Sequence, residues 1–279
     1  MDKRIHQAIR LIEEQVGERI ALDDIAGAVG LSRAQFNRLF MAGTGEAPSD
    51  YLRRIRLDMA AARLRWTQQS VGAAAVEVGY DSQPSFTQAF GRRYGVSPGS
   101  FRQDRERWPD KDSSGIHERR VRVVELDGFT CWGRRYIGPT QNAPHHWQHF
   151  LAGLPPALRD TATFVGILRD DLRFTPPDRV RYDCCILLGD DADTSALPDD
   201  LLPITTHPGM AATVRHRGGY GHDERTGLCV ANTYAFLLDE WISASRHTFA
   251  ANYVLEIYTE TPGRLDPDMA ECTIIAPIL

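Results

Sequence analysis

Hydrogen-bonding side chains gather on one side of two short segments in the first hundred residues. In the first segment they are those of Arg33, Gln35, Asn37 and Arg38, and in the second those of Gln83, Ser85, Thr87, Gln88 and Arg92. Arginine, asparagine, glutamine and serine carry donors and acceptors that match base edges in the major groove of DNA. The two segments are therefore candidates for contact with DNA bases.

A single acidic residue interrupts an alternating segment near the end of the chain. Leu255 and Ile257 suit a sheet face covered by helices, so Glu256 and Tyr258 are expected on the opposite face, in a cleft. A lone buried carboxylate is costly, and burial raises its pKa. A cationic, flat or lipophilic ligand would supply the missing charge and pack on aromatic rings. These residues predict a small-molecule site.

Helical periodicity places the first set of polar side chains on a helix. Residues 5–16 and 22–29 carry apolar side chains at helical spacing. Gly30 follows, where a left-handed helix end belongs, and Ser32 can cap a helix over 33–41. A short helix, a glycine turn and a second helix with polar side chains form a helix-turn-helix unit, whose second helix enters the major groove.

The same design returns about 49 residues later. A short helix is predicted over 71–78, Gly79 ends it, and Ser82 precedes a second helix that ends near Tyr94. Residues 49–66 can form one long helix between the two units. Two such units joined by one helix predict a DNA-binding domain much more strongly than one unit does.

These residues resemble the AraC/XylS family of DNA-binding domains over about residues 5–105. The similarity is carried by Gly30-Leu-Ser-Arg-Ala-Gln-Phe-Asn-Arg-Leu-Phe40, Thr44-Gly-Glu-Ala-Pro48, Arg54-Ile-Arg-Leu57, Ala74 to Gly79, Tyr80 and Phe86-Thr-Gln-Ala-Phe-Gly-Arg-Arg-Tyr-Gly-Val-Ser-Pro98. It implies an all-α, homeodomain-like double helix-turn-helix fold. Each recognition helix would then enter a separate major-groove segment on one face of double-stranded DNA.

The resemblance also implies which positions read bases. They are Arg33, Ala34, Gln35, Asn37 and Arg38 in the first unit, and Gln83, Pro84, Ser85, Thr87 and Gln88 in the second, with Arg92 on the same outward face. Ala34 stands where some members have a large aromatic residue, and Gln88 stands where an arginine is often found. The operator sequence therefore cannot be inferred from other members.

Composition divides the chain into two domains. Residues 1–107 carry 16 basic and 13 acidic side chains, whereas residues 108–279 carry 16 and 24. The basic excess permits DNA binding without establishing it. Residues 108–118 are polar, contain Pro109 and Gly115, and are predicted to be a linker before a domain over 119–279.

The second domain is predicted to be an α+β fold of two strand-helix-strand-strand repeats. The first repeat contains a strand over 119–137 bent at Asp127-Gly128, a helix over 142–151 and strands over 163–169 and 181–188. The second contains a strand over 210–217, a helix over 227–243 and strands over 253–259 and 271–277. Gly166 and Leu168 occupy the positions that correspond to Glu256 and Tyr258, so the carboxylate has no symmetric partner.

This domain resembles the GyrI-like, or SHS2-repeat, family of small-molecule-binding domains. The similarity is carried by Arg181-Tyr-Asp183, Pro208-Gly209, His216-x-Gly-Gly-Tyr220, the end of the Trp241 helix, Glu256-x-Tyr258 and Ile275-Ala-Pro-Ile278. It implies that Glu256 contacts a lipophilic cation, with Trp147 and Tyr220 as further aromatic contacts. The order of the two domains is similar to that of the Rob-like regulators.

Several other classes of protein and site are not expected. The sequence has no apolar run of about 18 residues, and Glu13 and Glu14 interrupt the first apolar stretch, so neither a membrane span nor a signal peptide is predicted. The five cysteines show no Cys-x-x-Cys spacing, which favours a reducing cytoplasm. His145, His146 and His149 have a spacing that could hold a metal on a helix, but we expect neither a metal nor a cofactor.

The sequence therefore predicts a cytoplasmic, nucleoid-associated transcription regulator with an effector domain. Its expected partners are double-stranded DNA and a small lipophilic or cationic effector, with RNA polymerase as a further candidate and no membrane. Two alternatives stay open: hydrolase activity that uses Glu256 as a general base, or a second domain used only for protein contacts. The sequence does not decide between activation and repression.

Overall fold

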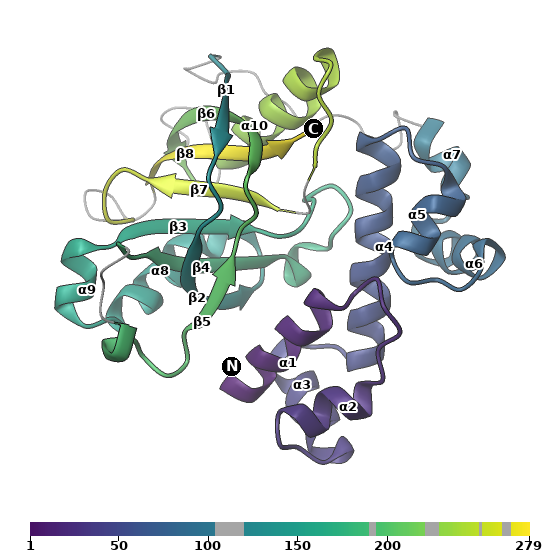
Figure 1. The fold of residues 1–279 in the computed structure, drawn as a ribbon, viewed down its shortest axis with the longest axis horizontal. Coiled ribbons are helices and arrows are strands. Elements are labelled where there is room, and N and C mark those ends of the chain that lie inside the picture. Colours follow the sequence, from purple (N-terminus) through teal and green to yellow (C-terminus); the bar gives the residue numbers. More distant parts are fainter. Residues whose placement is uncertain (104–119, 190–193, 221–228, 251–252, 264–268) are drawn as a thin grey trace. The chain divides into compact units, whose positions relative to one another are not determined.

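The computed structural model describes residues 1–103, 120–189, 194–220, 229–250, 253–263 and 269–279 (Figure 1). The chain separates into two compact units. One consists of Met1–Pro109 with Arg173–Thr175, and the other of Asp110–Leu172 with Pro176–Leu279. The predicted linker, residues 108–118, lies outside the described residues. Within the described part, no helix has the length and hydropathy needed to cross a bilayer.

The first unit is all-helical, as predicted. Its helices are α1 (Lys3–Glu14), α2 (Leu22–Ala28), α3 (Arg33–Thr44), α4 (Pro48–Trp66), α5 (Val71–Glu77), α6 (Gln83–Tyr94) and α7 (Pro98–Gln103). Only α7 was not predicted, because its six residues are too few to show helical periodicity.

The local rules that end and start helices hold in both helix-turn-helix units. Gly30 and Gly79 have φ angles of 68° and 81°, which favour glycine. The Ser32 hydroxyl accepts a hydrogen bond from the Gln35 backbone amide, and Ser82 is the corresponding cap of α6. The same turn and capping devices therefore precede α3 and α6.

Helix α4 takes part in two separate cores. Tyr51, Leu52 and Ile55 pack with residues of α1, α2 and α3. Further along the helix, Leu57 and Leu64 pack with residues of α5, α6 and α7. One helix of 19 residues therefore carries both helix-turn-helix units on different parts of its surface.

The second unit is an α+β domain around an eight-stranded sheet. Its strands are β1 (Arg122–Leu126), β2 (Thr130–Ile137), β3 (Thr163–Leu168), β4 (Arg181–Leu187), β5 (Leu202–Thr205), β6 (Gly209–Gly219), β7 (Val254–Tyr258) and β8 (Met269–Ile278). The strand order is β1-β6-β8-β7-β3-β4-β2-β5, and each pair is antiparallel. The helices are α8 (Ala143–Ala152), α9 (Pro156–Thr161) and α10 (Val230–Ala235), which continues as a π-helical segment, Phe236–Ile242.

The two predicted repeats are present and meet at the centre of the sheet. Strands β2, β3 and β4 with α8 form the first repeat, and β6, β7 and β8 with α10 form the second. Strands β3 and β7 pair across the pseudo-twofold axis, with Gly166 opposite Glu256. Outward from this pair, β7 is followed by β8 and β6, and β3 is followed by β4 and β2, so the two repeats have the same strand order.

The prediction of one strand bent at Asp127-Gly128 is wrong. Strand β1 pairs with β6, whereas β2 pairs with β4 and β5 on the far side of the sheet. The connection runs across the sheet, and the Phe129 amide donates to the Thr206 hydroxyl at 3.0 Å. The Thr206 amide donates back to the Phe129 carbonyl at 2.8 Å. The β1–β2 connection and the β5–β6 connection therefore stabilise each other. Alternation of apolar and polar residues along one segment cannot predict such a contact between distant segments.

Candidate nucleic-acid interface and effector site

The outward face of α3 presents the side chains assigned to base reading. Phe36 and Phe40 point into the core. The exposed residues include Arg33, Ala34, Gln35, Asn37 and Arg38. Their exposure leaves their donors and acceptors at the surface, as a role in DNA contact requires. The role of each remains a prediction.

Two of these side chains also act within the protein. The Arg33 guanidinium pairs with the Asp23 carboxylate at 2.7 Å, in an exposed ion pair that contributes little stability. The Gln35 side-chain oxygen accepts a hydrogen bond from the Ser32 amide at 3.2 Å, which completes a capping box. Base contact by Gln35 would therefore compete with capping of its own helix.

Helix α6 shows the corresponding pattern in the second helix-turn-helix unit. Phe86, Ala89 and Phe90 are buried. The residues assigned to DNA contact that are exposed are Gln83, Pro84, Ser85, Gln88 and Arg92, and Thr87 is half-buried. Both helices therefore present polar side chains outward.

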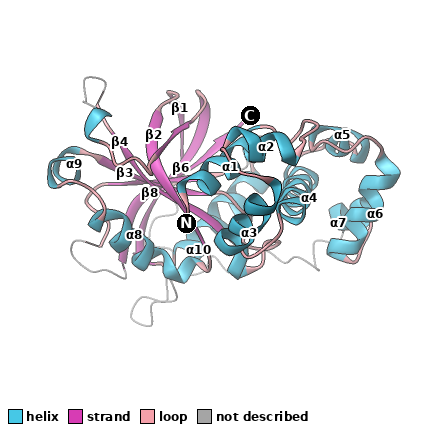
Figure 2. Ribbon diagram, turned by 90° about the horizontal axis from the view of Figure 1, so that it is seen from below, coloured by secondary structure: helices cyan, strands magenta, loops and turns pink. Residues whose placement is uncertain are grey.

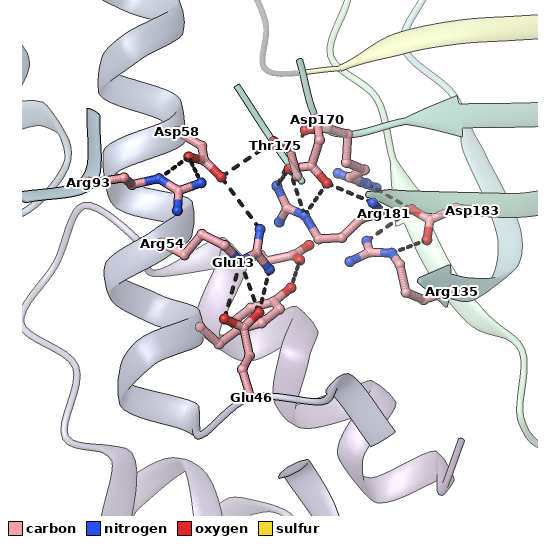
Figure 3. A network of polar contacts seen from close by, with 12 residues as sticks. Glu13, Glu46, Arg54, Asp58, Arg93, Arg135, Asp170, Thr175, Arg181 and Asp183 are labelled. Atoms are coloured by element: carbon pink, nitrogen blue, oxygen red, sulfur yellow. Dashed lines mark hydrogen bonds and ion pairs between the residues drawn. The ribbon is translucent and has the colours of Figure 1, made fainter. Parts of the chain in front are cut away.

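Buried charges on α4 hold the C-terminal ends of α3 and α6 (Figure 3). The Arg54 guanidinium donates to the Glu46 carboxylate, at 2.7 Å, in the loop that follows α3. The Asp58 carboxylate accepts hydrogen bonds from Arg93 at 2.8 Å and from the Tyr94 hydroxyl at 2.6 Å, both on α6. These bonds fix α3 and α6 against the same helix.

In the second unit, a carboxylate held by three tyrosines lies under the helices. Glu256 is 1% exposed. One carboxylate oxygen accepts hydrogen bonds from the hydroxyls of Tyr182 and Tyr258, each at 2.5 Å. The other accepts from the Tyr234 hydroxyl. Four polar side chains therefore form one hydrogen-bonded network.

The network continues into the aromatic residues predicted from the sequence. The Tyr220 hydroxyl donates to the Tyr258 hydroxyl at 2.6 Å. The Trp147 ring packs edge-on against Tyr258, with the ring centres 5.1 Å apart. A Cβ atom at Gly166 would lie 2.7 Å from the Glu256 carboxylate. Glycine at this position of the first repeat therefore leaves the space that the acid of the second repeat fills.

The structure brings all four predicted effector residues together, but not in an open cleft. Tyr234 lies on α10 and Trp147 on α8, so the helices cover the same sheet face as Glu256 (Figure 2). The expected placement of the helices on the opposite face is therefore wrong. Leu255 lies on that opposite face, in an apolar cluster that the crossing connection containing Phe129 helps to cover. Alternation along a strand separates its two faces but does not say which face receives the helices.

Two tyrosines of the site were missed. Tyr182 pairs in register with Leu168, which was itself assigned to the face of Glu256, so alternation could have identified it. Tyr234 could not be found in this way, because the helices were expected on the other side. Each of the two contributes a hydrogen bond to the carboxylate.

Burial raises the pKa of the Glu256 carboxyl, and the hydrogen bonds from the three tyrosines oppose this effect. Burial also raises the pKa of Tyr182, Tyr234 and Tyr258 well above the ordinary value, so these hydroxyls stay protonated as donors. The site therefore combines one titrating acid with neutral, donating phenols.

The raised pKa of Glu256 predicts a pH-dependent difference in stability. Below the ordinary value of 4.5, the carboxyl is protonated in both the folded and the unfolded chain. Above it, the unfolded chain releases the proton first, so this contribution to stability is lost as the pH rises through the folded pKa. The free energy of urea unfolding of wild type should therefore fall with pH relative to that of Glu256→Gln.

Comparing the unfolding free energies of wild type and Glu256→Gln at each pH isolates the contribution of the Glu256 carboxyl. Burial lowers the pKa of His146 and His216 to about 4, so both histidines also make stability depend on pH. They titrate equally in wild type and variant, and their effect cancels in the difference. A difference that is constant between pH 4 and pH 8 would contradict the prediction.

A second buried charge network crosses strands β2 and β4 (Figure 3). Asp183 is fully buried and pairs with Arg135, which faces it across the strand pair. Arg169 also donates to Asp183 at 2.7 Å. Next to it on β4, Arg181 pairs with Asp170 at 2.7 Å. Each of these buried charges has an opposite charge within hydrogen-bonding distance.

The histidines of α8 make contacts with a tyrosine. His146 stacks on the Tyr136 ring, with the ring centres 4.6 Å apart. The His149 ring nitrogen lies 3.0 Å from the Tyr136 hydroxyl. Over the described residues, no three histidine, cysteine or acidic side chains are grouped as metal ligands would be.

Two family models match this chain. A helix-turn-helix domain model matches residues 25–104. A model described as a GyrI-like small molecule binding domain matches residues 119–279. The second match covers more than half of the chain.

Curated relatives match part of the chain. The chain is 37% identical over 102 residues to an uncharacterized HTH-type transcriptional regulator of Haemophilus influenzae, a match that covers 37% of this chain and 34% of that protein. It is 35% identical over 103 residues to the HTH-type transcriptional regulator MtrA of Neisseria gonorrhoeae, with 37% and 34% covered. It is 32% identical over 100 residues to the regulatory protein SoxS of Escherichia coli, with 36% and 94% covered. The matches span 34% to 43% of the first three curated relatives.

Solved structures also match part of the chain. One is an AraC-type regulator from Chromobacterium violaceum, at 32% identity and a TM-score of 0.35, covering 37% of this chain and 91% of that one. Another is the DNA-binding domain of AdpA in complex with a target DNA, at 28% identity and a TM-score of 0.36, covering 39% and 98%.

Proposed function

Because the chain belongs to the GyrI-like family and carries an AraC-type helix-turn-helix domain, we propose that it is a transcription regulator controlled by a small molecule. The helix-turn-helix domain precedes the GyrI-like domain along the chain. The observation that carries the proposal is the paired outward faces of α3 and α6, each supported by a short helix and a glycine turn. The SoxS match, which covers nearly all of that regulator, supports a DNA-reading role for this unit.

In this proposal the two recognition helices contact adjacent major-groove segments of double-stranded DNA. The contacting residues are Arg33, Ala34, Gln35, Asn37, Arg38, Gln83, Pro84, Ser85, Thr87, Gln88 and Arg92. Arg38 and Arg92 are exposed arginines on the outward faces, and arginine bonds both guanine acceptors and phosphates. RNA polymerase is the further partner that we propose for the DNA-bound protein.

The proposed effector is a lipophilic cation bound at Glu256, Tyr258, Trp147 and Tyr220. A buried carboxylate attracts a cation strongly in a medium of low dielectric constant, and the aromatic rings offer faces to it. The carboxylate oxygens already accept hydrogen bonds from three tyrosines. A ligand would therefore have to displace Tyr234 and α10 to reach them.

Control of DNA binding follows only if the effector binds two states of the protein with different affinities. Displacement of Tyr234 distinguishes a ligand-bound from a ligand-free state of the second unit. The proposed ligand is bound and released unchanged. Consumption of a cation by wild type that disappears in Glu256→Gln would instead favour a hydrolase.

The protein-contact alternative is tested with ligands. A lipophilic cation that binds only the folded protein raises its melting temperature, by an amount that grows with ligand concentration. The full-length protein is therefore melted in a panel of quaternary ammonium and phosphonium compounds. The absence of any shift across the panel would favour a domain that serves protein contacts alone.

Replacement of Arg38 by alanine should weaken binding to the specific operator by about 1–3 kcal/mol and relax the sequence preference at one position. The operator is first obtained by footprinting the purified full-length protein on genomic DNA. Gel-shift titrations of operator and of scrambled DNA then give the two affinities for each variant.

Arg10→Ala is the matched control for this measurement. Arg10 lies on α1, pairs with Glu14 at 3.0 Å, and is outside both recognition helices. Its loss removes one positive charge and should leave the preference for operator over scrambled DNA unchanged. Equal affinity of wild type and Arg38→Ala for the operator would remove Arg38 from the interface.

A further inference from the structure

The two helix-turn-helix units touch each other beside helix α4. Gly17, in the loop after α1, lies against the end of α5. A Cβ atom at Gly17 would be 2.5 Å from the Glu77 carbonyl oxygen, a distance that only a glycine avoids. Glu77 ends α5, directly before the turn that leads into α6. The units are therefore in backbone contact as well as on a common helix.

Arg56 of α4 fills the space at this contact. Its Nε atom donates to the Val16 carbonyl at 2.9 Å, and its Nη2 atom donates to the Glu18 carbonyl at 2.5 Å. The same guanidinium lies against Gly79, where a Cβ atom would be 2.8 Å from Nη2. Gly79 also has a positive φ angle of 81°, and a Cβ atom there would lie 3.1 Å from the backbone carbonyl carbon of Gly17, so its backbone conformation and its close packing on the loop both favour glycine.

We propose that Arg56 is a positioning residue for DNA recognition, which together with Gly17 and Gly79 sets the distance between the two DNA segments that the protein accepts. This inference rests on the proposed DNA-binding function. The loop that Arg56 holds precedes α2 and α3, and Gly79 precedes α6. The guanidinium therefore lies between the parts of the chain that carry the two recognition helices.

A single helix cannot by itself fix the relative rotation of two units attached to it. Helix α4 packs with each helix-turn-helix unit over about half its length, and a helix of 19 residues can curve gently along its axis. A second contact away from the helix axis removes that freedom. The planar guanidinium suits this position, because it holds two carbonyls at once.

The other bond between these segments is weak. Arg19, in the same loop, pairs with Asp81 at 3.0 Å, but the two side chains are 88% and 77% exposed. An ion pair in such contact with water contributes little free energy. The half-buried Arg56 and the two glycines therefore provide most of the constraint.

The spacing of the DNA segments gives a direct test. Each inserted base pair moves a groove segment by about 3.4 Å along the DNA and turns it by about a tenth of a helical turn. A DNA site is selected from a random library with the wild-type full-length protein. Derivatives with one or two base pairs inserted or removed between its two half-sites are then titrated with each variant.

One inserted base pair should weaken wild-type binding by about tenfold or more, because a rigid protein cannot follow both segments. For Arg56→Ala the penalty should fall to about threefold or less, and Arg56→Lys should lie between the two because lysine is a single point donor. Arg63→Ala is the matched control. Arg63 lies on the same helix, but its guanidinium donates to the Glu77 carboxylate at 2.8 Å within the second helix-turn-helix unit. Its spacing profile should match that of wild type.

A distance measurement without DNA separates this inference from the proposed function. Spin labels are attached at Met41→Cys on α3 and Val76→Cys on α5, both of which are exposed, in a protein with Cys229→Ser. The distance distribution should broaden in Arg56→Ala and stay narrow in Arg63→Ala. Gly17→Ala should shift it, since the added Cβ pushes the loop from Glu77.

An unchanged spacing profile together with an unchanged distance distribution in folded Arg56→Ala would overturn the inference. Failure of wild type to select any DNA, with a broadened distribution in Arg56→Ala, would overturn the proposed function while the positioning of the two units by Arg56 stands.

Discussion

Replacement of Glu256 by glutamine should weaken the binding of a lipophilic cation by about 2–5 kcal/mol. The substitution keeps the volume of the side chain, so the contacts of Trp147 and Gly166 with the site are preserved, but it removes the negative charge. The cation would then enter a buried site without an opposite charge. Isothermal titration of the full-length protein with a quaternary phosphonium compound measures the loss.

The pH dependence of the same affinity gives a second readout. Because burial raises the pKa of Glu256, part of the wild-type protein carries a neutral carboxyl in mildly acidic solution. Affinity for the cation should therefore increase as the pH rises through that pKa, and the affinity of Glu256→Gln should not. A neutral ligand of the same shape should show no pH dependence with either protein.

Glu271→Gln controls for a change of charge that is outside the site. Glu271 lies on β8, and its side chain is 45% exposed beside Arg215. This variant should bind the cation as wild type does. Equal affinities of wild type, Glu256→Gln and Glu271→Gln for every cation that binds would place the effector elsewhere in the protein.

Replacement of Asp183 by asparagine should lower the free energy of unfolding of the second unit by about 3–5 kcal/mol. Asp183 and Arg135 are both almost fully buried, and Arg169 donates to the same carboxylate. Asparagine has nearly the same shape, so packing is retained while two guanidinium groups lose their opposite charge. Urea unfolding, followed by tryptophan fluorescence, gives the change.

An exposed ion pair provides the control for Asp183. Asp178 pairs with Arg179 at 3.3 Å, and its side chain is 70% exposed. Asp178→Asn should change the unfolding free energy by less than about 1 kcal/mol. A similarly small change in Asp183→Asn would show that its buried network is not a main source of stability.

The helical unit could be predicted in detail from the sequence. Its helices are defined by contacts between residues three or four positions apart, and Ser32, Gly30 and Gly79 mark the ends through local backbone chemistry. The outward direction of Arg38 and Gln88 follows from the burial of Phe36 and Phe86 on the same helices. The contact of Arg56 with the carbonyls of Val16 and Glu18 was not predicted, because 38 or more residues separate them.

The sequence was enough to predict the helix-turn-helix repeats, the two repeats of the sheet domain and the presence of one acid without a symmetric partner. These properties depend on residue type and short-range periodicity. The folded chain was needed to show that β1 and β2 separate, that the helices cover the face of Glu256, and that Tyr182 and Tyr234 complete its hydrogen bonds. The physical reason is that alternation defines two faces of a strand, whereas its neighbours and its cover are chosen by the packing of distant segments.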